Sequence, residues 1–294
     1  MLPPTCWSGR SRSYSTASPS DGESLVSQNP GRLVLLGHPV AHSLSPIFQN
    51  AALRAAGMSL LYEAVDVVPR DLLALLKKLK DLGVGGNVTI PHKVKVHASC
   101  DELTDIAERV GAVNTFWFES DKLHGDNTDV GGFDAAARAL LGGDTAGARI
   151  VVLGSGGAAA SVVAAAEQWP DAKVVIVARN QERASKLARR FRDVARVEKS
   201  AELAIADATL VVNATPVGQR EAEQPLDVTI IPKTAAVMDL VYRRGGGTPW
   251  VKAARKRGIP AADGLPMLLE QGALSFQRWF GIEPDREVMR QSLL

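Results

Sequence analysis

A buried strand that runs directly into a glycine loop and a helix is the feature that most restricts the fold. The strand is the aliphatic run at 150–153, and an alanine-rich helical segment follows the loop. The loop matches the pattern G-x-G-x-x-[G/A] in the strand–loop–helix context that gives this pattern its meaning. It consists of Gly154, Ser155, Gly156, Gly157, Ala158 and Ala159.

Such a loop suits a pyrophosphate group. Glycines let the backbone approach the phosphates, and the helix N-terminus offers free N–H groups and the positive end of its dipole. The segment therefore predicts a dinucleotide-binding βαβ unit, with a tight strand-to-helix turn as the alternative.

Residues at the end of the second strand of this unit distinguish NADP from NAD. An NAD site usually has an acid there for the ribose 2′-hydroxyl, whereas this chain has Ala178, Arg179 and Asn180, with Arg183 shortly after. Two guanidinium groups suit a 2′-phosphate. Glu182 lies inside the next helix and beside Arg183, so the sequence favours NADP.

Aliphatic strands alternate with amphipathic helices along the chain. We expect strands at 31–40, 60–67, 85–90, 150–153, 172–179, 208–216 and 235–242, and helices at 45–57, 69–83, 133–141 and 265–281. Two more strands, joined by a turn at Ser120-Asp121, are expected between the third strand and the helix at 133–141. This order implies mainly parallel sheets covered by helices.

We therefore expect an α/β protein of two α/β domains with a cleft between them. Residues 31–130, completed by a C-terminal helix at 265–290, would form a substrate-binding domain with a mainly parallel sheet. A turn-rich boundary near 142–147 precedes a Rossmann-like NADP-binding domain at 143–262. Ligands of such sheets bind outside the carboxyl ends of the strands.

Composition argues against several function classes. Net charge is +2, from 34 basic and 32 acidic residues, which gives no electrostatic case for nucleic acid or an anionic membrane. No apolar run reaches the roughly 18 residues of a transmembrane helix. Two cysteines, Cys6 and Cys100, fit a reducing cytosol. We expect a cytoplasmic protein that binds a small molecule and no metal, and a homodimer stays open.

Residues 1–30 differ from the rest of the chain. They are rich in serine and lack apolar periodicity, so we expect a disordered N-terminal extension. Arg10 and Arg12, with no acid before Asp21, give a faint resemblance to a transit peptide. We favour a flexible tail over that alternative.

The stretch Gly85–His97 combines a strand pattern with chemistry. Val88 and Ile90 alternate with Asn87 and Thr89, which predicts an aliphatic face in the core and a polar face toward a ligand. A proline then ends the strand before His92 and Lys93. From residue type alone His92 is the usual acid–base candidate, and Lys93 could equally lie on a solvated surface.

Seven ordered motifs make the chain resemble the shikimate dehydrogenases. They are GHPVAHSLSP, GGNVTIPHK, GAVNT, GDNTD, GSGGAAAS, VNATPVG and DGLPMLLEQGA, and they span about residues 33–281. The resemblance implies reversible reduction of 3-dehydroshikimate to shikimate with NADPH, a step of aromatic amino acid biosynthesis. Two alternatives stay open: a quinate/shikimate or aminoshikimate dehydrogenase, and a non-catalytic sensor that binds a dinucleotide and a metabolite. The motifs argue against a folate-type methylene dehydrogenase.

The resemblance also assigns roles to residues. Lys93 and Asp129 are implied as the catalytic pair, an ammonium that moves a proton and a carboxylate that orients it. The implied substrate-binding residues are Ser43, Ser45, Asn87, Thr89, Lys93, Asn114, Asp129, Tyr242 and Gln271. Besides the glycine loop, the implied cofactor-binding residues are Ala178 (where the family more often has Asn), Arg179, Asn180, Arg183, Asn213, Ala214, Thr215, Leu240, Gly264 and Met267.

Overall fold

The first sheet is mixed and has the strand order β2-β1-β3-β5-β6-β4. The computed structural model describes residues 30–219, 223–243 and 246–294. Strand β1 pairs in parallel with β2 and β3, whereas β5 is antiparallel to both of its neighbours. The strands are β1 (Arg32–Gly37), β2 (Tyr62–Asp66), β3 (Val84–Val88), β4 (Glu102–Leu103), β5 (Thr115–Glu119) and β6 (Lys122–Asp126).

The second sheet is parallel throughout, with the order β12-β11-β10-β7-β8-β9. Its central strands are continuous runs of buried aliphatic residues, as expected for strands covered on both faces. The strands are β7 (Arg149–Leu153), β8 (Lys173–Val177), β9 (Ala195–Val197), β10 (Leu210–Asn213), β11 (Ala236–Asp239) and β12 (Ala261–Ala262).

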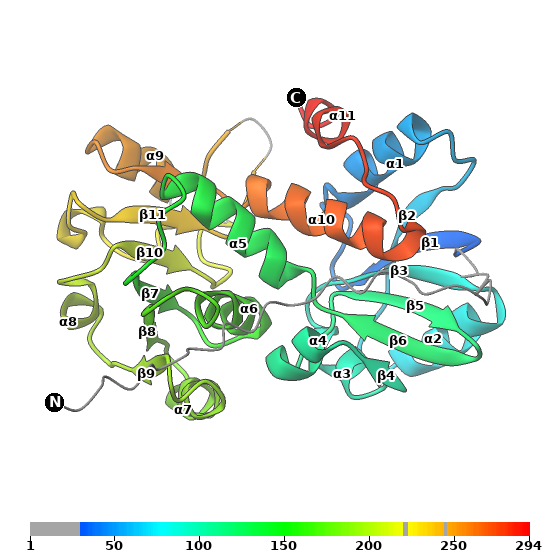
Figure 1. The fold of residues 1–294 in the computed structure, drawn as a ribbon, viewed down its shortest axis with the longest axis horizontal. Helices are drawn as coiled ribbons and strands as arrows, with labels where there is room; N and C mark the ends of the chain where they lie inside the picture. The colour runs from blue at the N-terminus through cyan, green and yellow to red at the C-terminus, as the bar shows by residue number, and fades with distance from the viewer. Residues whose placement is uncertain (1–29, 220–222, 244–245) are drawn as a thin grey trace, which may run out of the picture.

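Helices cover both sheets and fill the space between them (Figure 1). The first unit contains α1 (Ser45–Ala55), α2 (Leu72–Asp81), α3 (Lys93–His97) and α4 (Asp105–Val110). The remaining helices are α5 (Asp129–Leu140), α6 (Gly157–Ala166), α7 (Gln181–Arg190), α8 (Ala201–Ile205), α9 (Pro249–Lys256), α10 (Leu265–Phe280), α11 (Arg286–Gln291) and a short 3-10 turn, η1 (Val228–Ile230).

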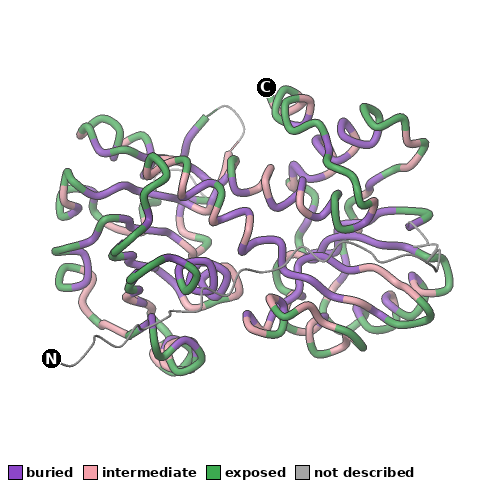
Figure 2. The backbone as a smooth tube through the Cα atoms, in the orientation of Figure 1, coloured by how far each residue is buried: buried purple, intermediate pink, exposed green. Residues whose placement is uncertain are grey.

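Helices α5 and α10 lie against one another between the two sheets (Figure 1). They are in close contact at Gly132, where an added Cβ would lie 2.8 Å from the backbone nitrogen of Gln271 and 2.9 Å from the carbonyl oxygen of Met267. Both helices are buried along this contact (Figure 2). The missing side chain of Gly132 therefore sets the distance between the helices.

The expected fold class is confirmed: an α/β chain with two mainly parallel sheets. Every described strand of the first sheet lies within 31–130, and every described strand of the second within 143–262. We propose the division at these boundaries as the domain organisation. The expected N-terminal extension lies outside the described residues, apart from Pro30. None of the described helices is long and apolar enough to cross a membrane.

Three local expectations were wrong. Helix α5 begins at Asp129 and not at Phe133, and the short helices α3 and α4 were not expected. Ile90 was expected in the core but is 65% exposed. Strand β3 ends at Val88, so the period-2 alternation stops before Ile90.

Replacing Gly132 by alanine should destabilise the protein. The added methyl group meets backbone atoms of α10, which cannot move without shifting the helix, so we expect a loss of about 1–3 kcal/mol in the free energy of unfolding. Urea unfolding measures this change. Gly131→Ala is the matched control, because its nearest contact is the flexible end of Leu274. Equal stability of the two variants would contradict the close-packing argument.

Candidate active site

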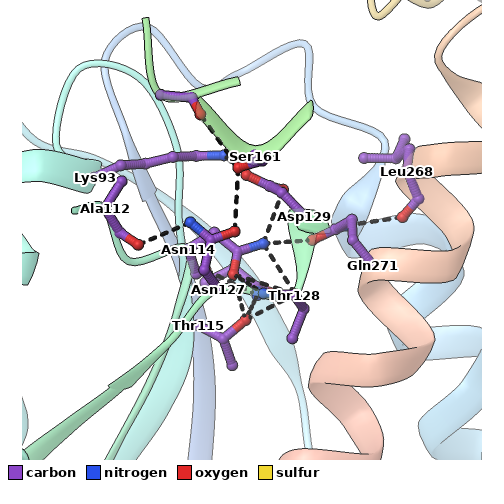
Figure 3. A network of polar contacts seen from close by, with 12 residues as sticks. Lys93, Ala112, Asn114, Thr115, Asn127, Thr128, Asp129, Ser161, Leu268 and Gln271 are labelled. Atoms are coloured by element: carbon purple, nitrogen blue, oxygen red, sulfur yellow. Dashed lines mark hydrogen bonds and ion pairs between the residues drawn. The ribbon is translucent and has the colours of Figure 1, made fainter. Parts of the chain in front are cut away.

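Lys93 and Asp129 form an ion pair although they lie far apart in the sequence. The ammonium nitrogen Nζ is 2.5 Å from Oδ2 of Asp129, and the two side chains are 19% and 8% exposed. Figure 3 shows the lysine extending toward the carboxylate. Each residue is the first residue of its helix, α3 or α5. The pair predicted from the resemblance is therefore brought together in a largely buried position.

His92 anchors the loop that carries Lys93. Its side chain is 1% exposed, and Nε2 lies 2.7 Å from the carbonyl oxygen of Val67. Burial lowers the pKa of His92 below its usual value, so the neutral ring can donate its N–H to that carbonyl. The carbonyl oxygen of Lys93 accepts a hydrogen bond from the backbone of Val113. His92 thus holds this loop in place, and the side chain beside Asp129 is that of Lys93.

Asn114 joins the carboxylate to the C-terminal helix. Its Oδ1 accepts the backbone N–H of Thr128 at 2.8 Å, and a backbone amide can only donate, so the orientation of the side-chain amide is settled. Nδ2 then faces Oδ1 of Asp129 at 2.9 Å and Oε1 of Gln271 at 3.1 Å. Gln271 in turn donates to the carbonyl of Leu268 (Figure 3).

Asn87 is buried, and its side chain is fully engaged within the protein. Its Oδ1 accepts the hydroxyl of Tyr62 at 2.8 Å. Its Nδ2 faces three acceptors, namely the Asn114 carbonyl and the hydroxyl oxygens of Thr115 and Ser275, at 2.9 to 3.0 Å. An amide nitrogen has only two hydrogens, so no donor is left over. Direct contact between Asn87 and a substrate stays a prediction; in this structure Asn87 supports its neighbours.

Ser43, Ser45 and Tyr242 come together where β1 leads into α1. Oγ of Ser43 accepts the backbone N–H of Ser45 at 3.2 Å. Tyr242 comes from the second unit; burial raises the pKa of its phenol, and hydrogen bonds to the Ser43 side chain and the Leu44 backbone act in the opposite direction. Two serine hydroxyls at the start of a helix that contains Pro46 suit an anionic group.

Thr89 presents a free hydroxyl near the same strand ends. Its methyl group packs close to Gly37, and its backbone N–H donates to Leu36. Its hydroxyl makes no hydrogen bond within the part of the chain that the structure describes. It therefore fits the predicted role of binding a substrate hydroxyl better than Asn87 does.

The glycine loop of the second unit lies beside Lys93. A Cβ added at Gly157 would be 4.0 Å from Cδ of Lys93 and 3.9 Å from Cβ of Ala112. Gly154 has φ +123°, and a Cβ there would be 2.9 Å from the carbonyl oxygen of Ala214, so this position requires glycine. A Cβ at Gly156 would meet no heavy atom within 4 Å. The part of the loop from Ser155 to Ala158 is thus open to a phosphate beside the ion pair. Ala159, also predicted to bind the cofactor, is 0% exposed and packs in the core instead.

The residues after β8 suit a 2′-phosphate. Arg179 and Arg183 are exposed, and neither forms an ion pair with a residue in the described ranges. Asn180 caps α7 by accepting the backbone N–H of Arg183 at 2.9 Å. Glu182 pairs with Lys186 at 2.8 Å. This pairing agrees with the expectation that Glu182 does not bind the ribose, while Ala178 has no polar side-chain group to offer.

The other predicted cofactor residues lie at strand ends of the second sheet and at the start of α10. Asn213 ends β10, with Ala214 and Thr215 following. Gly264 and Leu240 are in close backbone contact, since a Cβ at Gly264 would be 2.3 Å from the carbonyl oxygen of Leu240. Met267 is buried one turn into α10. Their contact with the cofactor, implied by the resemblance, stays a prediction.

Four hydroxyl residues of the buried network were not singled out from the sequence: Tyr62, Thr115, Thr128 and Ser275. Two of them stand inside quoted motifs, GAVNT and GDNTD. Ser275 follows Gln271 by four residues, so both lie on one face of a largely apolar helix. Ser275 donates to the Gln271 carbonyl at 2.9 Å. A polar i, i+4 pair in such a helix was the available signal.

Three family models match the chain. They are the shikimate dehydrogenase substrate binding domain at residues 35–116, shikimate / quinate 5-dehydrogenase at 135–224, and the shikimate 5′-dehydrogenase C-terminal domain at 264–294. The shikimate dehydrogenase (NADP(+)) of Methanopyrus kandleri is 41% identical, with 88% of this chain and 93% of that protein covered. The chain belongs to the shikimate dehydrogenase family.

Solved structures agree with this family membership. The crystal structure of shikimate dehydrogenase from Aquifex aeolicus has a TM-score of 0.84 and 37% identity, covering 89% of this chain and 96% of that one. The shikimate 5-dehydrogenase of Thermus thermophilus, solved in complex with NADP(H) and shikimate, has a TM-score of 0.81 and 37% identity, covering 89% and 98%.

The buried His92 should make stability depend on pH. Its pKa is lowered in the folded protein, so the unfolded chain binds more protons as the pH falls through about 6.5. Stability attributable to His92 is therefore present above that pH and decreases below it. Urea unfolding at pH 7.5, 6.5 and 5.5 should show a smaller loss for His92→Gln than for the parent. The exposed His42, replaced by Gln, is the control, and a slope unchanged by His92→Gln would contradict the assignment.

Proposed function

We propose that this protein is an NADP-dependent oxidoreductase that reversibly reduces 3-dehydroshikimate to shikimate, in the pathway to aromatic amino acids. The observation that carries the proposal is the buried Lys93–Asp129 pair beside the glycine loop. This pair supports the proposal because an ammonium beside the glycine loop suits proton donation next to a dinucleotide, in a chain of a dehydrogenase family. Identity with NADP(+)-dependent relatives and exposed Arg179 and Arg183 support NADP as the cofactor.

The protein's own contribution to the reaction is proton transfer and positioning. NADPH supplies the hydride when it is bound. The Lys93 ammonium gives a proton to the oxygen of the substrate carbonyl as that oxygen becomes an alkoxide, and it takes the proton back in the oxidation direction. Asp129 keeps the ammonium oriented, and Asn114 holds the other carboxylate oxygen. Mutual orientation by fixed hydrogen bonds lowers the cost of reaching the reacting geometry.

Substrate binding divides between charged and neutral groups of the ligand. We propose that Ser43 and Ser45 bind the carboxylate at the start of α1, and that Tyr242 closes this side. Thr89 and Gln271, with Asn114 and Asn87 behind them, are proposed for the ring hydroxyls. Lys93 and Asp129 are proposed for the hydroxyl or carbonyl that reacts.

Quinate is the second candidate substrate, because one matching family model covers both shikimate and quinate dehydrogenases. A non-catalytic metabolite sensor is disfavoured, since a sensor has no need of a buried lysine paired with a carboxylate. A homodimer and a cytoplasmic location are proposed on the family alone.

A four-way assay tests the proposed function. Purified protein is given shikimate or quinate with NADP+ or NAD+, and formation of the reduced cofactor is followed by absorbance. We expect the highest kcat/KM with shikimate and NADP+.

Arg179→Ala should raise the KM for NADP+ much more than the KM for NAD+, because only NADP+ carries the 2′-phosphate. Equal effects on the two cofactors would refute the role of Arg179. In the four-way assay, no turnover of either substrate by the parent protein would refute the proposed dehydrogenase activity.

Lys93→Ala should lower kcat by about 10²–10⁴, the range of a general acid–base group, and leave the KM for shikimate within a few-fold. Steady-state kinetics measure both constants. Lys95→Ala is the control, because Lys95 lies in the same short helix and its exposed ammonium donates to the Pro69 carbonyl, away from Asp129. Thermal melting verifies that each variant is folded. A folded Lys93→Ala protein with most of the parental kcat would exclude Lys93 as the proton donor.

A further inference from the structure

Asp239 is a fully buried carboxylate that the proposed chemistry does not use. It is the last residue of β11, is 0% exposed, and pairs in register with Asn213, the last residue of β10. Both residues lie at the carboxyl edge of the second sheet, where ligands of such sheets bind. Burying a carboxylate is costly unless its oxygens receive hydrogen bonds. The position of Asp239 therefore calls for a structural reason.

Three donors from three segments converge on this carboxylate. Nδ2 of Asn213 donates to Oδ1 at 2.7 Å, and the backbone N–H of Val241 donates to the same oxygen at 3.1 Å. The hydroxyl of Thr248, which also caps α9, donates to Oδ2 at 2.6 Å. Burial raises the pKa of Asp239, and these hydrogen bonds act in the opposite direction. Asp239 thus holds together the ends of β10 and β11 and the start of α9.

Through Asn213 the carboxylate controls the loop at 213–217. Oδ1 of Asn213 accepts the backbone N–H of Thr215 at 3.0 Å, which settles the amide orientation. Nδ2 then donates to Asp239 and to the carbonyl of Val217, at 2.7 and 2.9 Å. No donor of this side chain is left for a ligand. Asn213 therefore shapes the loop, and Asp239 fixes Asn213.

Through Val241 the same carboxylate controls the path toward the first unit. Val241 precedes Tyr242, a partly buried tyrosine that lies near Ser43. The Val241 carbonyl also accepts the backbone N–H of Gly264, which caps α10, at 3.0 Å. Asp239 is therefore connected through Asn213 to the loop at 213–217. It is connected through Val241 to the segment that meets the proposed substrate-binding serines.

Strand order indicates which half of a dinucleotide lies here. The glycine loop follows β7, and Arg179 follows the neighbouring β8, so the adenosine 2′-phosphate half extends toward β8. The strands on the other side of β7 are β10 and then β11. The remaining half of the ligand, which carries the nicotinamide, must therefore cross the ends of these two strands.

We propose that Asp239 is a positioning residue for the nicotinamide half of NADP. It acts through Asn213 and Val241 and contacts neither NADP nor the substrate. The inference rests on the proposed NADP-dependent reaction. It predicts an effect confined to one half of the cofactor. A general loss of structure would instead weaken binding of both halves.

The test compares NADP+ with 2′,5′-ADP, which contains only the adenosine half. Asp239→Ala removes the acceptor of three donors, so we expect the Kd of NADP+ to rise and the kcat to fall by about tenfold each. The Kd of 2′,5′-ADP should stay within about twofold, since Arg179 and the glycine loop are unchanged. Calorimetry measures the affinities. Asp207→Asn, an acid exchanged for an amide on the surface of the same unit, should leave every constant unchanged.

Asp239→Asn serves as a second variant in case the alanine variant does not fold. Its Oδ1 can still accept from Asn213 and Val241 while its Nδ2 donates to the Thr248 oxygen, so about a threefold effect on NADP+ is expected. Parental NADP+ affinity and kcat in either folded variant would overturn the proposal, as would equal weakening of NADP+ and 2′,5′-ADP. If the parent oxidises neither shikimate nor quinate, the proposed reaction fails, but the two affinities still decide the role of Asp239.

Discussion

One backbone N–H, that of Thr128, determines how the polar centre of this protein is arranged. Hydroxyl groups can rotate and side-chain amides can flip, but a backbone amide can only donate. Its bond to Oδ1 of Asn114 turns the Asn114 nitrogen toward Asp129 and Gln271. That single donor therefore fixes the Asn114 amide with its nitrogen toward the carboxylate, whose other oxygen accepts the Lys93 ammonium.

Helix α5 makes this arrangement rigid. Asp129 is its first residue, and Gly132, less than one turn later, lies against the backbone of α10. The same helix therefore carries the carboxylate and a close backbone contact with α10. Helix α10 also supplies Gln271. The two acceptors of the Asn114 amide nitrogen, Asp129 and Gln271, are therefore held by one packed pair of helices.

The sequence was sufficient for the α/β architecture, because aliphatic strands, glycine loops and helix signals are local. The contact between Lys93 and Asp129 was not visible in it, since 36 positions separate them and only the fold brings them together. Ile90 was misplaced because strand β3 ends at Val88, two residues before it. Tyr62 and Asp239 were missed because a polar group in a buried strand is indistinguishable from a turn residue until its partners are known.

The ion pair between Glu182 and Lys186 bears on attempts to redesign the cofactor preference. Glu182 is the first acid after β8 in the sequence, yet its carboxylate pairs along α7 with the lysine one turn later. Removing the arginines would therefore leave a site with little affinity for either nucleotide. An engineered preference for NAD would need a new carboxylate at the position of Ala178, directly after β8, where a short side chain would face the 2′-hydroxyl.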